Sequence, residues 1–530
     1  MSELLHELVL RGADKYGEEE ALRYQGRILS YSQLANEFER VAGGLYSLGL
    51  ARQERVATYI PKRFEAVTAL FGTAMAGGTF VPVNPLLKPP QVGHILRDCN
   101  VRILFTATAR FKDLAETLLE CHDLHTVVLV DDAGDLTSGD AGLRVISWQQ
   151  LIRNGVDTPR HRVIDTDMAA ILYTSGSTGK PKGVVLSHRN MVTGAKSVAQ
   201  YLENRPSDRL LAVLPLSFDY GFSQISTAFV SGACAVLMDY LLPRDVVNAV
   251  AKESITGLAG VPPLWIQLAQ MSWPDEATAT LRYMTNSGGA MPRKTLDLLR
   301  SSLPRTQVFL MYGLTEAFRS TYLPPQELDR RPDSMGKAIP NVEIQVVRED
   351  GTLCAPGEAG ELVHRGSLVA LGYWNDPGKT AERFKPMPRQ DSGLVLPEIA
   401  VWSGDTVRMD EEGYLYFVGR RDDMIKTSGY RVSPTEVEEV VYATGRVTEA
   451  AAVGVPHPGL GQAVVVVAAP RQADLDESDA VIEECRRRLP NFMVPAQIVW
   501  RTSLPRNPNG KIDRKSLAAE LQDLYQENSL

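Results

Sequence analysis

Residues 168–185 read MAAILYTSGSTGKPKGVV. The first half is an apolar run, residues 169–173, and it predicts a buried β-strand. The second half brings hydroxyl groups, glycines and lysines together in one short loop. Glycines let backbone N–H groups approach an anion closely, hydroxyls donate to phosphate oxygens, and lysines supply positive charge. The strand and the loop together therefore predict a site for nucleotide phosphates.

The loop differs from the P-loop of nucleoside triphosphatases. Gly176 and Gly179 are too close together for the GxxxxGK[ST] spacing, and Pro181 follows Lys180 where that motif has serine or threonine. Composition alone would also allow a mobile Gly/Ser surface loop. The apolar strand directly before the loop favours the nucleotide interpretation.

Much of the chain before residue 335 alternates strand and helix patterns. Residues 30–46 repeat apolar side chains at helical spacing after a serine suited to cap a helix. Residues 55–60 and 79–83 predict buried strands, and residues 64–75 predict the helix between them. Such strand–helix–strand repetition predicts parallel sheets with helices on both faces.

The pattern changes along the last third of the chain. Short strands separated by Gly and Pro turns dominate residues 335–420, and an α+β pattern follows the charged run at 419–423. The expected fold is therefore α/β with two domains. Residues 1–420 form a large N-terminal domain of parallel-rich sheets with flanking helices, which includes the β-rich subdomain. Residues 421–530 form a small, mobile α+β domain.

Composition narrows the functional classes. Hydrophobic residues make up 44% and charged residues 23%, which is typical of soluble globular proteins. The net charge of -8 argues against a nucleic-acid partner. Five scattered cysteines without a CxxC pair suggest neither a disulfide framework nor a zinc site. The chain shows no signal peptide and no apolar stretch of about 20 residues, so we expect a cytoplasmic protein without a membrane span.

Six motifs along the chain resemble, in the same order, those of the adenylate-forming superfamily. That superfamily contains acyl-CoA synthetases, adenylation domains of nonribosomal peptide synthetases, and luciferases. The resemblance implies ATP-dependent activation of a carboxylic acid to an acyl-adenylate with release of pyrophosphate, followed by thioester formation. The phosphate loop is the first motif, and the others are NSGGA at 286–290, MYGLTEA at 311–317, WSGD at 402–405, GRRDDMIK at 419–426 and RNPNGKID at 506–513.

The resemblance also assigns roles to individual residues. Lys511 would stabilise the charge that develops as the carboxylate attacks the α-phosphorus, and Thr178 and Glu316 would assist, with Glu316 as the Mg²⁺ ligand. Asp422 would be the hinge between two domain arrangements. Ser428 and Gly429 would line the tunnel for the acceptor thiol. The nucleotide would contact Thr174, Ser175, Gly176, Ser177, Thr178, Gly179, Lys182, Ser287, Gly288, Gly289, Ala290, Met311, Tyr312, Gly313, Thr315, Asp405 and Arg420.

The stretch LPLSFDYG at 214–221 indicates which kind of carboxylic acid is activated. Amino-acid-activating domains have Phe-Asp here, and Asp219 would pair with the α-ammonium group of the substrate; the alternative is that Asp219 caps a helix. Arg319 is unusual for such a pocket: pointing inward it would suggest a second acidic group on the substrate, and the outward orientation is slightly favoured. The expected pocket is Phe218, Asp219, Tyr220, Ser223, Gly260, Thr285, Ser287, Met311, Arg319 and Ser320.

The sequence leaves more than one hypothesis open for the acceptor thiol and for the overall activity. The favoured function is loading of an amino acid onto the phosphopantetheine of a separate carrier protein. The alternative is an acyl-CoA synthetase for a non-amino acid, because the sequence also resembles the acyl ligases that accompany exosortase systems. A luciferase-like oxidase and an inactive nucleotide-binding relative are the other hypotheses. The intact Thr178, Glu316, Asp405, Arg420 and Lys511 argue against the inactive relative.

Overall fold

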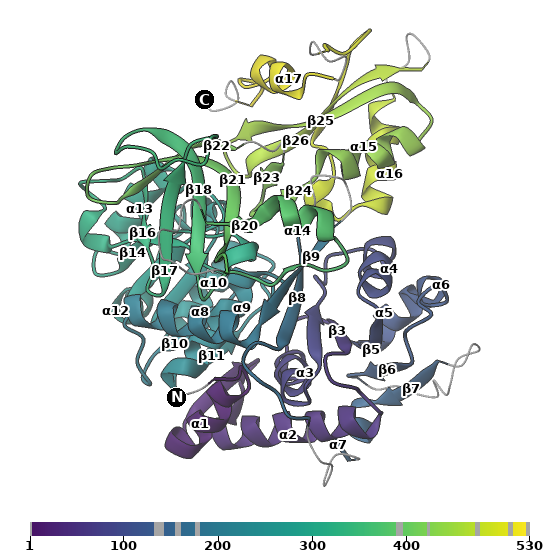
Figure 1. Ribbon diagram of the computed structural model, residues 1–530, viewed down its shortest axis with the longest axis vertical. Coiled ribbons are helices and arrows are strands. Elements are labelled where there is room, and N and C mark those ends of the chain that lie inside the picture. The colour runs from purple at the N-terminus through teal and green to yellow at the C-terminus, as the bar shows by residue number, and fades with distance from the viewer. Residues whose placement is uncertain are drawn as a thin grey trace.

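A computed structural model describes residues 3–131, 143–153, 161–174, 181–387, 396–420, 424–471, 477–506 and 512–525. The described strands form sheets of fourteen, eight and five strands. The first two sheets belong to the larger body of the molecule, and the third belongs to a smaller body above it (Figure 1). The last strand of the larger body ends at Arg420 and the first strand of the smaller one begins at Ile425.

The fourteen-stranded sheet is parallel from β14 through β13, β12, β10 and β11 to β1, and antiparallel elsewhere. The β-rich region continues this sheet directly, because β16 pairs with β15. Its strands are β1 (Glu20–Tyr24), β2 (Arg27–Ser30), β10 (Arg209–Ala212), β11 (Cys234–Leu237), β12 (Gly257–Gly260), β13 (Tyr283–Asn286), β14 (Gln307–Tyr312), β15 (Thr321–Leu323), β16 (Ser334–Ala338), β17 (Val342–Val347), β18 (Ala359–Gly366), β20 (Phe384–Pro386), β21 (Ile399–Met409) and β22 (Leu415–Arg420).

The eight-stranded sheet places the phosphate-loop strand β8 beside β4, in parallel, and beside β9, in antiparallel orientation. Its strands are β3 (Arg55–Tyr59), β4 (Thr79–Pro82), β5 (Val101–Thr106), β6 (Thr126–Leu129), β7 (Arg144–Ser147), β8 (Met168–Thr174), β9 (Lys182–Ser187) and β19 (Gly372–Tyr373).

Helices pack around these two sheets. They are α1 (Glu7–Tyr16), α2 (Tyr31–Ser47), α3 (Phe64–Met75), α4 (Pro89–Asp98), α5 (Thr108–Asp113), α6 (Ala115–Leu118), α7 (Trp148–Arg153), α8 (His188–Tyr201), α9 (Asp219–Ser231), α10 (Pro243–Lys252), α11 (Pro262–Leu268), α12 (Asp275–Thr280), α13 (Arg293–Ser302) and α14 (Pro377–Arg383), with 3-10 turns η1 (Thr315–Ala317) and η2 (Pro325–Glu327).

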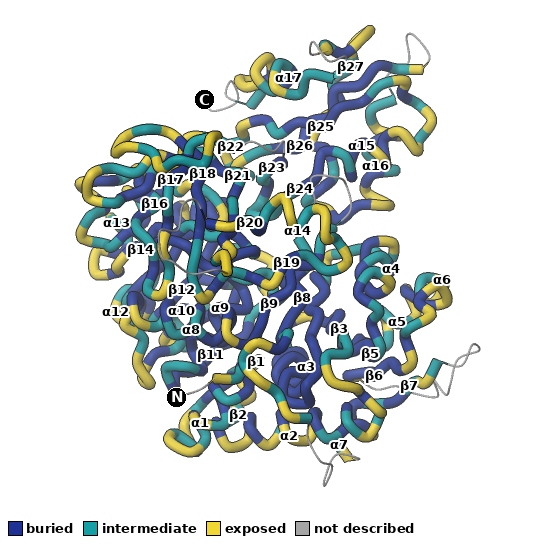
Figure 2. Tube along the Cα trace, viewed as in Figure 1, coloured by how far each residue is buried: buried dark blue, intermediate teal, exposed yellow. Residues whose placement is uncertain are grey.

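Helix α3 joins the two large sheets through the core. Nearly every residue of this helix is apolar or small, and the helix is buried along almost its whole length (Figure 2). A helix that is apolar all round belongs in the interior. The ring of Phe71 stacks on Phe38 of α2 at 5.1 Å and on Phe222 of α9 at 5.5 Å. The active-site strands on both sides are therefore fixed to one shared core.

The smaller body is α+β. Its strands β25 and β26 form a long antiparallel pair, and β23 and β24 form a short hairpin that points toward the larger body (Figure 1). Its elements are β23 (Ile425–Thr427), β24 (Tyr430–Val432), α15 (Pro434–Ala443), β25 (Val447–His457), β26 (Gly461–Pro470), α16 (Ser478–Arg488), η3 (Asn491–Met493), β27 (Gln497–Trp500) and α17 (Arg514–Glu520).

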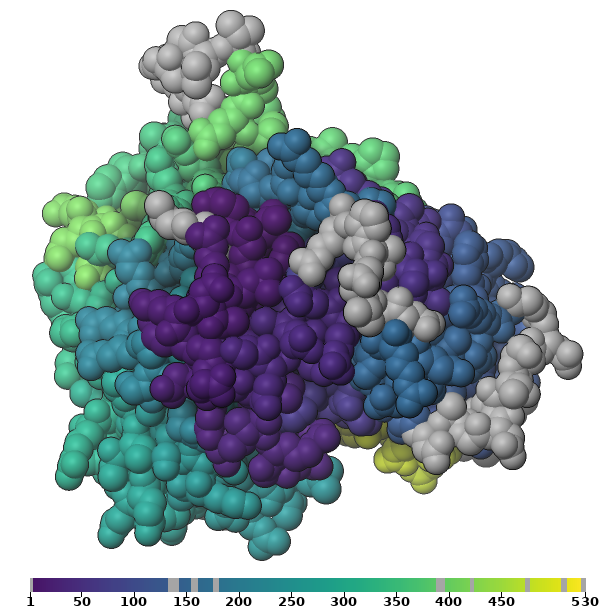
Figure 3. All heavy atoms as spheres, turned by 90° about the horizontal axis from the view of Figure 1, so that it is seen from below, coloured from purple at the N-terminus to yellow at the C-terminus, as the bar shows by residue number. Residues whose placement is uncertain are grey.

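The N-terminal helices close the side of the molecule away from the smaller body. Residues of α1 and α2 spread over the centre of this face (Figure 3). His188, at the start of α8, is buried beneath them, and its Nδ1 accepts a hydrogen bond from the N–H of Leu5 at 3.1 Å. Among the helices of the described ranges, none is both long enough and apolar enough to cross a bilayer.

The expected fold class is confirmed. Residues 64–75 form the predicted helix, and the helix expected at 30–46 is α2, whose N-terminus is a capping box between Ser30 and Gln33. The division at residues 420 and 421 falls between β22 and β23. As a domain boundary it stays a prediction.

Candidate active site

A cleft of about 180 Å³ lies between the two bodies. The C-terminal ends of β8 and β14 and the loop that follows β13 reach it. Both bodies contribute to its walls. Its lining is Pro82, Asn84, Leu87, Gln91, Ile95, Tyr173, Thr174, Pro181, Ser217, Phe218, Asp219, Tyr220, Val261, Ser287, Gly288, Tyr312, Gly313, Leu314, Thr315, Arg319, Asp405, Lys426, Gly429, Tyr430, Arg431, Glu436, Phe492 and Met493.

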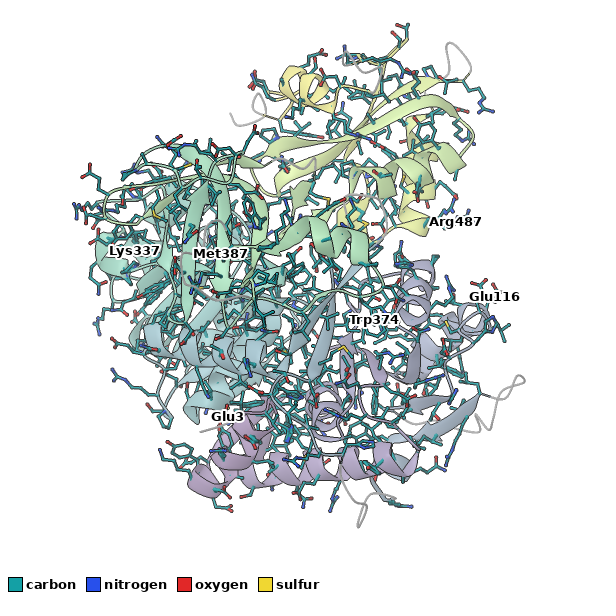
Figure 4. The ribbon with its side chains drawn as sticks, in the orientation of Figure 1. Glu3, Glu116, Lys337, Trp374, Met387 and Arg487 are labelled. Carbon is teal, nitrogen blue, oxygen red and sulfur yellow. The ribbon has the colours of Figure 1, made fainter. Side chains whose placement is uncertain are left out.

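The base of the phosphate loop opens into this cleft. Thr174, the last residue of β8, lines it. The neighbouring Tyr173 donates a hydrogen bond to Asp98 at 2.5 Å, and the indole N–H of Trp374, labelled in Figure 4, donates to the carbonyl of the same aspartate at 2.9 Å. The first bond fixes the end of β8 to α4, and the second ties the segment after β19 to the same helix. The predicted residues Ser175, Gly176, Ser177, Thr178 and Gly179 lie outside the described residues.

Lys182 begins β9 on the other side of the loop, and its ammonium group lies 5.3 Å from the centre of the Tyr373 ring. Its pKa is lowered, mainly because the side chain is partly buried and also because Lys379 is near. A half-buried lysine gains most from an anionic partner. This agrees with the predicted phosphate contact.

The predicted ribose ligand Asp405 lies in β21 and is buried. Tyr312, at the end of β14, donates its hydroxyl proton to Asp405 Oδ2 at 2.5 Å. The backbone register places Arg420 opposite Asp405 on the neighbouring strand. The structure describes the backbone of Arg420 but not its side chain. The structure thus brings two separate motifs, at 311–317 and 402–405, to one wall of the cleft.

Glu316, in the 3-10 turn after β14, is 3% exposed. Tyr373 donates to its Oε1 at 2.6 Å, whereas Oε2 is buried and has no partner among the described residues. Burial raises the pKa of this carboxyl group, but the charges of Arg383 and Arg431 and the bond from Tyr373 lower it further, so the pKa is lowered overall. Glu316 is therefore ionised and retains an oxygen for a cation.

This arrangement fits Mg²⁺, which binds through one or two carboxylates together with phosphate oxygens. The orphaned Oε2 of Glu316 is the protein oxygen that such an ion would need. No group of three or more metal-binding side chains occurs in the parts of the chain that are described. The donor set agrees with an ion shared between Glu316 and a bound nucleotide.

The loop after β13 is only partly in the cleft. Ser287 and Gly288 line it, and the side-chain amide of Asn286 holds the turn by donating to the carbonyl of Gly289 at 2.9 Å. Gly289 and Ala290, which were expected to contact the nucleotide, are not part of the lining. Gly313 and Thr315 do line the cleft, as expected.

The acid end of the cleft differs from expectation at Arg319. Its side chain is 2% exposed and points inward, so the favoured outward orientation is wrong. Its Nη1 donates to Asp219 Oδ2 at 3.2 Å, and its guanidinium lies 4.5 Å from the centre of the Tyr220 ring. The chain reverses at Phe318, which has a φ of 54°, and this reversal turns Arg319 into the protein.

Asp219 is the first residue of α9, and its Oδ1 accepts from the backbone N–H of Tyr220 at 2.8 Å. Its pKa is raised because burial outweighs the charge of Arg319. The alternative interpretation, that Asp219 caps the helix, is wrong: Phe218 is the N-cap residue of α9, and no side chain caps this end. Asp219 stands in the first turn, where a negative charge favours the helix. Arg319 already provides the cationic partner that was expected from the substrate.

Behind Arg319 lies a second, inner cavity of about 30 Å³. The hydroxyls of Tyr220 and Thr285 share a hydrogen bond of 2.6 Å in its wall. Tyr220 and Arg319 also line the cleft, so they stand between the two spaces. The lining is Val198, Leu202, Leu210, Leu211, Tyr220, Ser223, Gln224, Thr227, Gly257, Ala259, Tyr283, Thr285, Met311 and Arg319.

Several residues that were expected to line the acid pocket lie elsewhere in the structure. Met311 lies at the inner cavity rather than in the cleft, and its sulfur accepts a hydrogen bond from Tyr201 at 3.0 Å. Ser320 lines neither space, because its hydroxyl hydrogen-bonds with Nδ1 of His364 at 3.0 Å. Gly260 is also outside both linings: a Cβ there would meet Trp265 at 2.8 Å.

The β23–β24 hairpin of the smaller body enters the cleft from above. Gly429 has a φ of 81°, and a Cβ on it would lie 2.8 Å from the Val261 side chain. Only glycine suits both this conformation and this close approach. Tyr430 of the hairpin contacts Phe218 edge-on at 4.9 Å and stacks on Phe492 at 3.8 Å. Lys511 and Asp422 lie outside the described residues.

A larger cavity of about 650 Å³ lies at the junction of the two bodies, on the far side of the hairpin. Ser428 and Tyr430 line it, as do Lys88 and Arg110 from the larger body. The two predicted tunnel residues are thus separated: Ser428 faces this junction cavity and Gly429 faces the cleft. A path from one space to the other would pass along the hairpin.

Several residues of the site were not expected from the sequence. Tyr373 binds Glu316, Arg431 contributes charge to it, and Gln224 and Thr227 line the inner cavity. Arg431 lies two residues after the predicted tunnel residue Gly429, so its position in the sequence was a usable signal. The others come from elements without a recognisable motif.

Comparison with known proteins agrees with this geometry. The family model of the AMP-binding enzymes matches residues 9–374, and that of the AMP-binding enzyme C-terminal domain matches residues 436–511. A long-chain-fatty-acid–CoA ligase from Salmonella typhimurium is 32% identical over 97% of this chain and 94% of its own length. An L-proline–[L-prolyl-carrier protein] ligase from Pseudomonas fluorescens is 29% identical over 98% and 99%.

Among solved structures, the amide bond synthetase McbA from Marinactinospora thermotolerans has the same fold, with a TM-score of 0.84 at 24% identity over 98% of this chain and 99% of its own. The family models cover most of the chain, and the site brings their nucleotide motifs to one cleft. The chain therefore belongs to the AMP-binding enzymes of the adenylate-forming superfamily and is an AMP-forming acid–thiol ligase.

Proposed function

We propose that this ligase activates a compact carboxylic acid that lacks an α-ammonium group, and that it transfers the acyl group to coenzyme A. One observation supports this choice over an amino acid. Asp219, the residue that would receive an ammonium group, is already paired with the buried guanidinium of Arg319 at 3.2 Å. A second cation beside this pair would be repelled by Arg319 and would gain little from a carboxylate that is already neutralised.

The size of the acid follows from the inner cavity. One water-sized atom needs roughly 10–15 Å³ of such space, so a cavity of about 30 Å³ holds only a few heavy atoms. The long tail of a fatty acid does not fit there. The fatty-acid ligase relative is therefore a guide to the reaction of this chain, but not to the acid that this chain activates.

The first half-reaction takes place in the cleft. Asp405 accepts hydrogen bonds from the ribose hydroxyls of ATP, and Tyr312 holds this carboxylate in place by donating to its Oδ2 at 2.5 Å. Lys182 and the phosphate loop bind the phosphates, and Thr178 assists them. Lys511 stabilises the charge that develops when the substrate carboxylate attacks the α-phosphorus and pyrophosphate leaves.

Glu316 would hold Mg²⁺ through Oε2, while Tyr373 keeps the other oxygen of this carboxylate in place at 2.6 Å. When bound, the ion offsets the negative charge of the phosphate oxygens. The charges of Arg383 and Arg431 and the bond from Tyr373 outweigh the effect of burial on the pKa of Glu316, so they keep the carboxylate ionised.

The second half-reaction uses the hairpin of the smaller body. In this structure Ser428 and Gly429 already lie against the larger body. A turn of the smaller domain about Asp422 would exchange this arrangement with the one in which the Lys511 segment acts. The junction cavity would bind the acceptor, because Lys88 and Arg110 in its wall suit the phosphates of coenzyme A.

Loading of an amino acid onto a carrier protein is the second candidate. The proline carrier-protein ligase aligns with nearly the whole chain, and Asp219 does line the cleft. The two candidates differ in what Asp219 does. In the first it supports Arg319, and in the second it binds the substrate.

The test is ATP–pyrophosphate exchange over a matched panel of amino acids and their deaminated analogues, followed by thioester formation with coenzyme A or with a phosphopantetheinylated carrier protein. We expect exchange with the deaminated acids and transfer to coenzyme A. Asp219→Ala should lower exchange with every accepted acid by about the same factor, because Arg319 loses its partner. Exchange confined to amino acids, with an Asp219→Ala defect confined to them, would replace the first candidate with the second.

A further inference from the structure

The guanidinium of Arg319 has one edge without a partner. Nη1 is engaged twice, with Asp219 Oδ2 at 3.2 Å and with the carbonyl of Phe318 at 3.1 Å. Nε and Nη2 are fully buried and have no hydrogen-bond partner among the described residues. Buried N–H groups are nearly always paired in folded proteins, because an unpaired buried donor is costly. The unpaired edge therefore indicates a partner that binds from outside the chain.

The identity of the two free donors restricts that partner. The N–H bonds of Nε and Nη2 lie in one plane on one edge of the guanidinium and point the same way, which is the geometry that matches the two oxygens of a carboxylate. The ion pair with Asp219 uses Nη1 alone and leaves this edge available. A lysine would have been sufficient to neutralise Asp219.

The inner cavity contains two more polar atoms without partners. Oγ1 of Thr227 and Oε1 of Gln224 are buried and unpaired among the described residues, and both side chains line the same cavity as Arg319. The side-chain amide of Gln224 is held by a bond to the carbonyl of Tyr220 at 3.3 Å. Much of the remaining lining is aliphatic, including Leu210 and Leu211. The hydroxyl of Thr227 can donate to a carboxylate, whereas Oε1 of Gln224 can only accept and gives such a group no hydrogen bond.

We propose that the acid activated by this ligase has a second carboxylate, and that the Nε and Nη2 edge of Arg319 binds this carboxylate at the inner cavity while the first carboxylate reacts in the cleft. The inference rests on the proposed function and names the class of its substrate as compact dicarboxylic acids. Arg319 lines both spaces, so it can bind the distal end of a molecule whose reacting end lies beside the nucleotide. A cavity of about 30 Å³ is the size of a carboxyl group rather than of a longer chain.

The experiment measures ATP–pyrophosphate exchange with aliphatic dicarboxylic acids, from succinic to suberic acid, and with the benzene dicarboxylic acids. Each is compared with the monocarboxylic acid in which a methyl group replaces the distal carboxylate, and with the distal amide. We expect kcat/KM to favour the best dicarboxylic acid over its methyl analogue by at least roughly 100-fold, because a site built for a polar group strongly rejects an analogue that lacks it.

Arg319→Lys keeps the positive charge beside Asp219 and removes the planar pair of donors. We expect this variant to reduce the preference for the dicarboxylic acid to below about tenfold. Arg331→Lys is the matched control, because Arg331 is also a buried, ion-paired arginine but lies outside both linings. It should retain the full preference. If Arg319→Lys does not fold, Thr227→Val serves instead and should weaken exchange with dicarboxylic acids selectively.

The outcomes separate this inference from the proposed function. Exchange with monocarboxylic acids that equals exchange with dicarboxylic acids overturns the inference and leaves the proposed function intact. A preference that survives unchanged in Arg319→Lys also overturns it. Exchange with amino acids alone overturns the proposed function together with the inference.

Discussion

The cleft and the inner cavity are two adjoining spaces with opposite characters. The cleft of about 180 Å³ is lined by both bodies of the molecule and by residues from most of the six motifs. The inner cavity of about 30 Å³ is lined by the larger body alone and, apart from Met311, by residues outside those motifs. Arg319 and Tyr220 form the border between them.

The difference separates what the reaction requires from what the substrate requires. Every AMP-forming ligase must bind ATP and place a carboxylate beside its α-phosphorus, so the residues that do this recur as motifs. The acid itself is bound by side chains that need only suit one molecule. Changes in the cleft should therefore affect all acids equally, and changes in the inner cavity should alter the choice of acid.

The largest effect is expected from Lys511→Ala. If Lys511 stabilises the adenylation transition state as proposed, this change removes that charge, and we expect ATP–pyrophosphate exchange to fall by roughly 10²- to 10³-fold for every acid. Thioester formation from a supplied acyl-adenylate should continue, because that step does not use this side chain. Lys515→Ala, which removes an exposed lysine of α17, is the control. Undiminished exchange in Lys511→Ala would exclude the lysine from this role.

A smaller, step-specific effect is expected from Gly429→Ala. The new Cβ would lie 2.8 Å from Val261 and would hold the hairpin away from the cleft, so thioester formation should fall by roughly tenfold or more while exchange is retained. Gly413→Ala is the control: its φ of 83° is similar, but a Cβ there meets nothing within 4 Å. Equal behaviour of the two variants would mean that backbone strain, rather than the hairpin contact, causes the defect.

The smallest effect concerns Glu436, which lines the cleft at the start of α15. Burial and the nearby Glu439 raise its pKa to about 7 from an ordinary value of 4.5, so the folded protein retains a proton that the unfolded chain releases. Stability is thus lost as the pH rises through 7, by about 1.4 kcal/mol between pH 6 and pH 8. Glu436→Gln should remove this loss.

The measurement is the unfolding midpoint of wild type and Glu436→Gln in urea at pH 6 and pH 8. The unfolding midpoint of Glu436→Gln, relative to that of the wild type, should be higher at pH 8 than at pH 6. A constant difference between the two proteins at both pH values would show that Glu436 is not the titrating group.

Much of the cleft lining could be located from the sequence, because many of its residues belong to recognisable motifs. Thr174, Tyr312 and Asp405 line the cleft. Their roles toward the nucleotide stay predictions. The direction of Arg319 could not be predicted in this way. It depends on the reversal at Phe318, a non-glycine residue at a φ of 54°, and nothing in the local sequence indicates such a conformation.

The inner cavity was only partly predictable for a related reason. Ser223 and Thr285 were expected, but Gln224 and Thr227 lie on the same helix without a distinguishing pattern, and their role follows from which face of α9 meets β10 and β13. Ser320 was expected in the pocket from the resemblance to amino-acid-activating domains. Its contact with His364 joins two segments that are 44 residues apart in the chain, which no local pattern shows.

The reversal at Phe318 has a consequence for changing what this ligase accepts. The ring of Phe318 is buried against Gly194, where even a Cβ would lie 2.3 Å from it, so the segment from Glu316 to Arg319 is wedged in one position. Redesign through this segment would disturb the cation site along with acid choice. Ser223, Gln224 and Thr227 reach the same cavity from a separate helix. A mutant library restricted to that helix would leave the ATP machinery untouched while it searches for new acids.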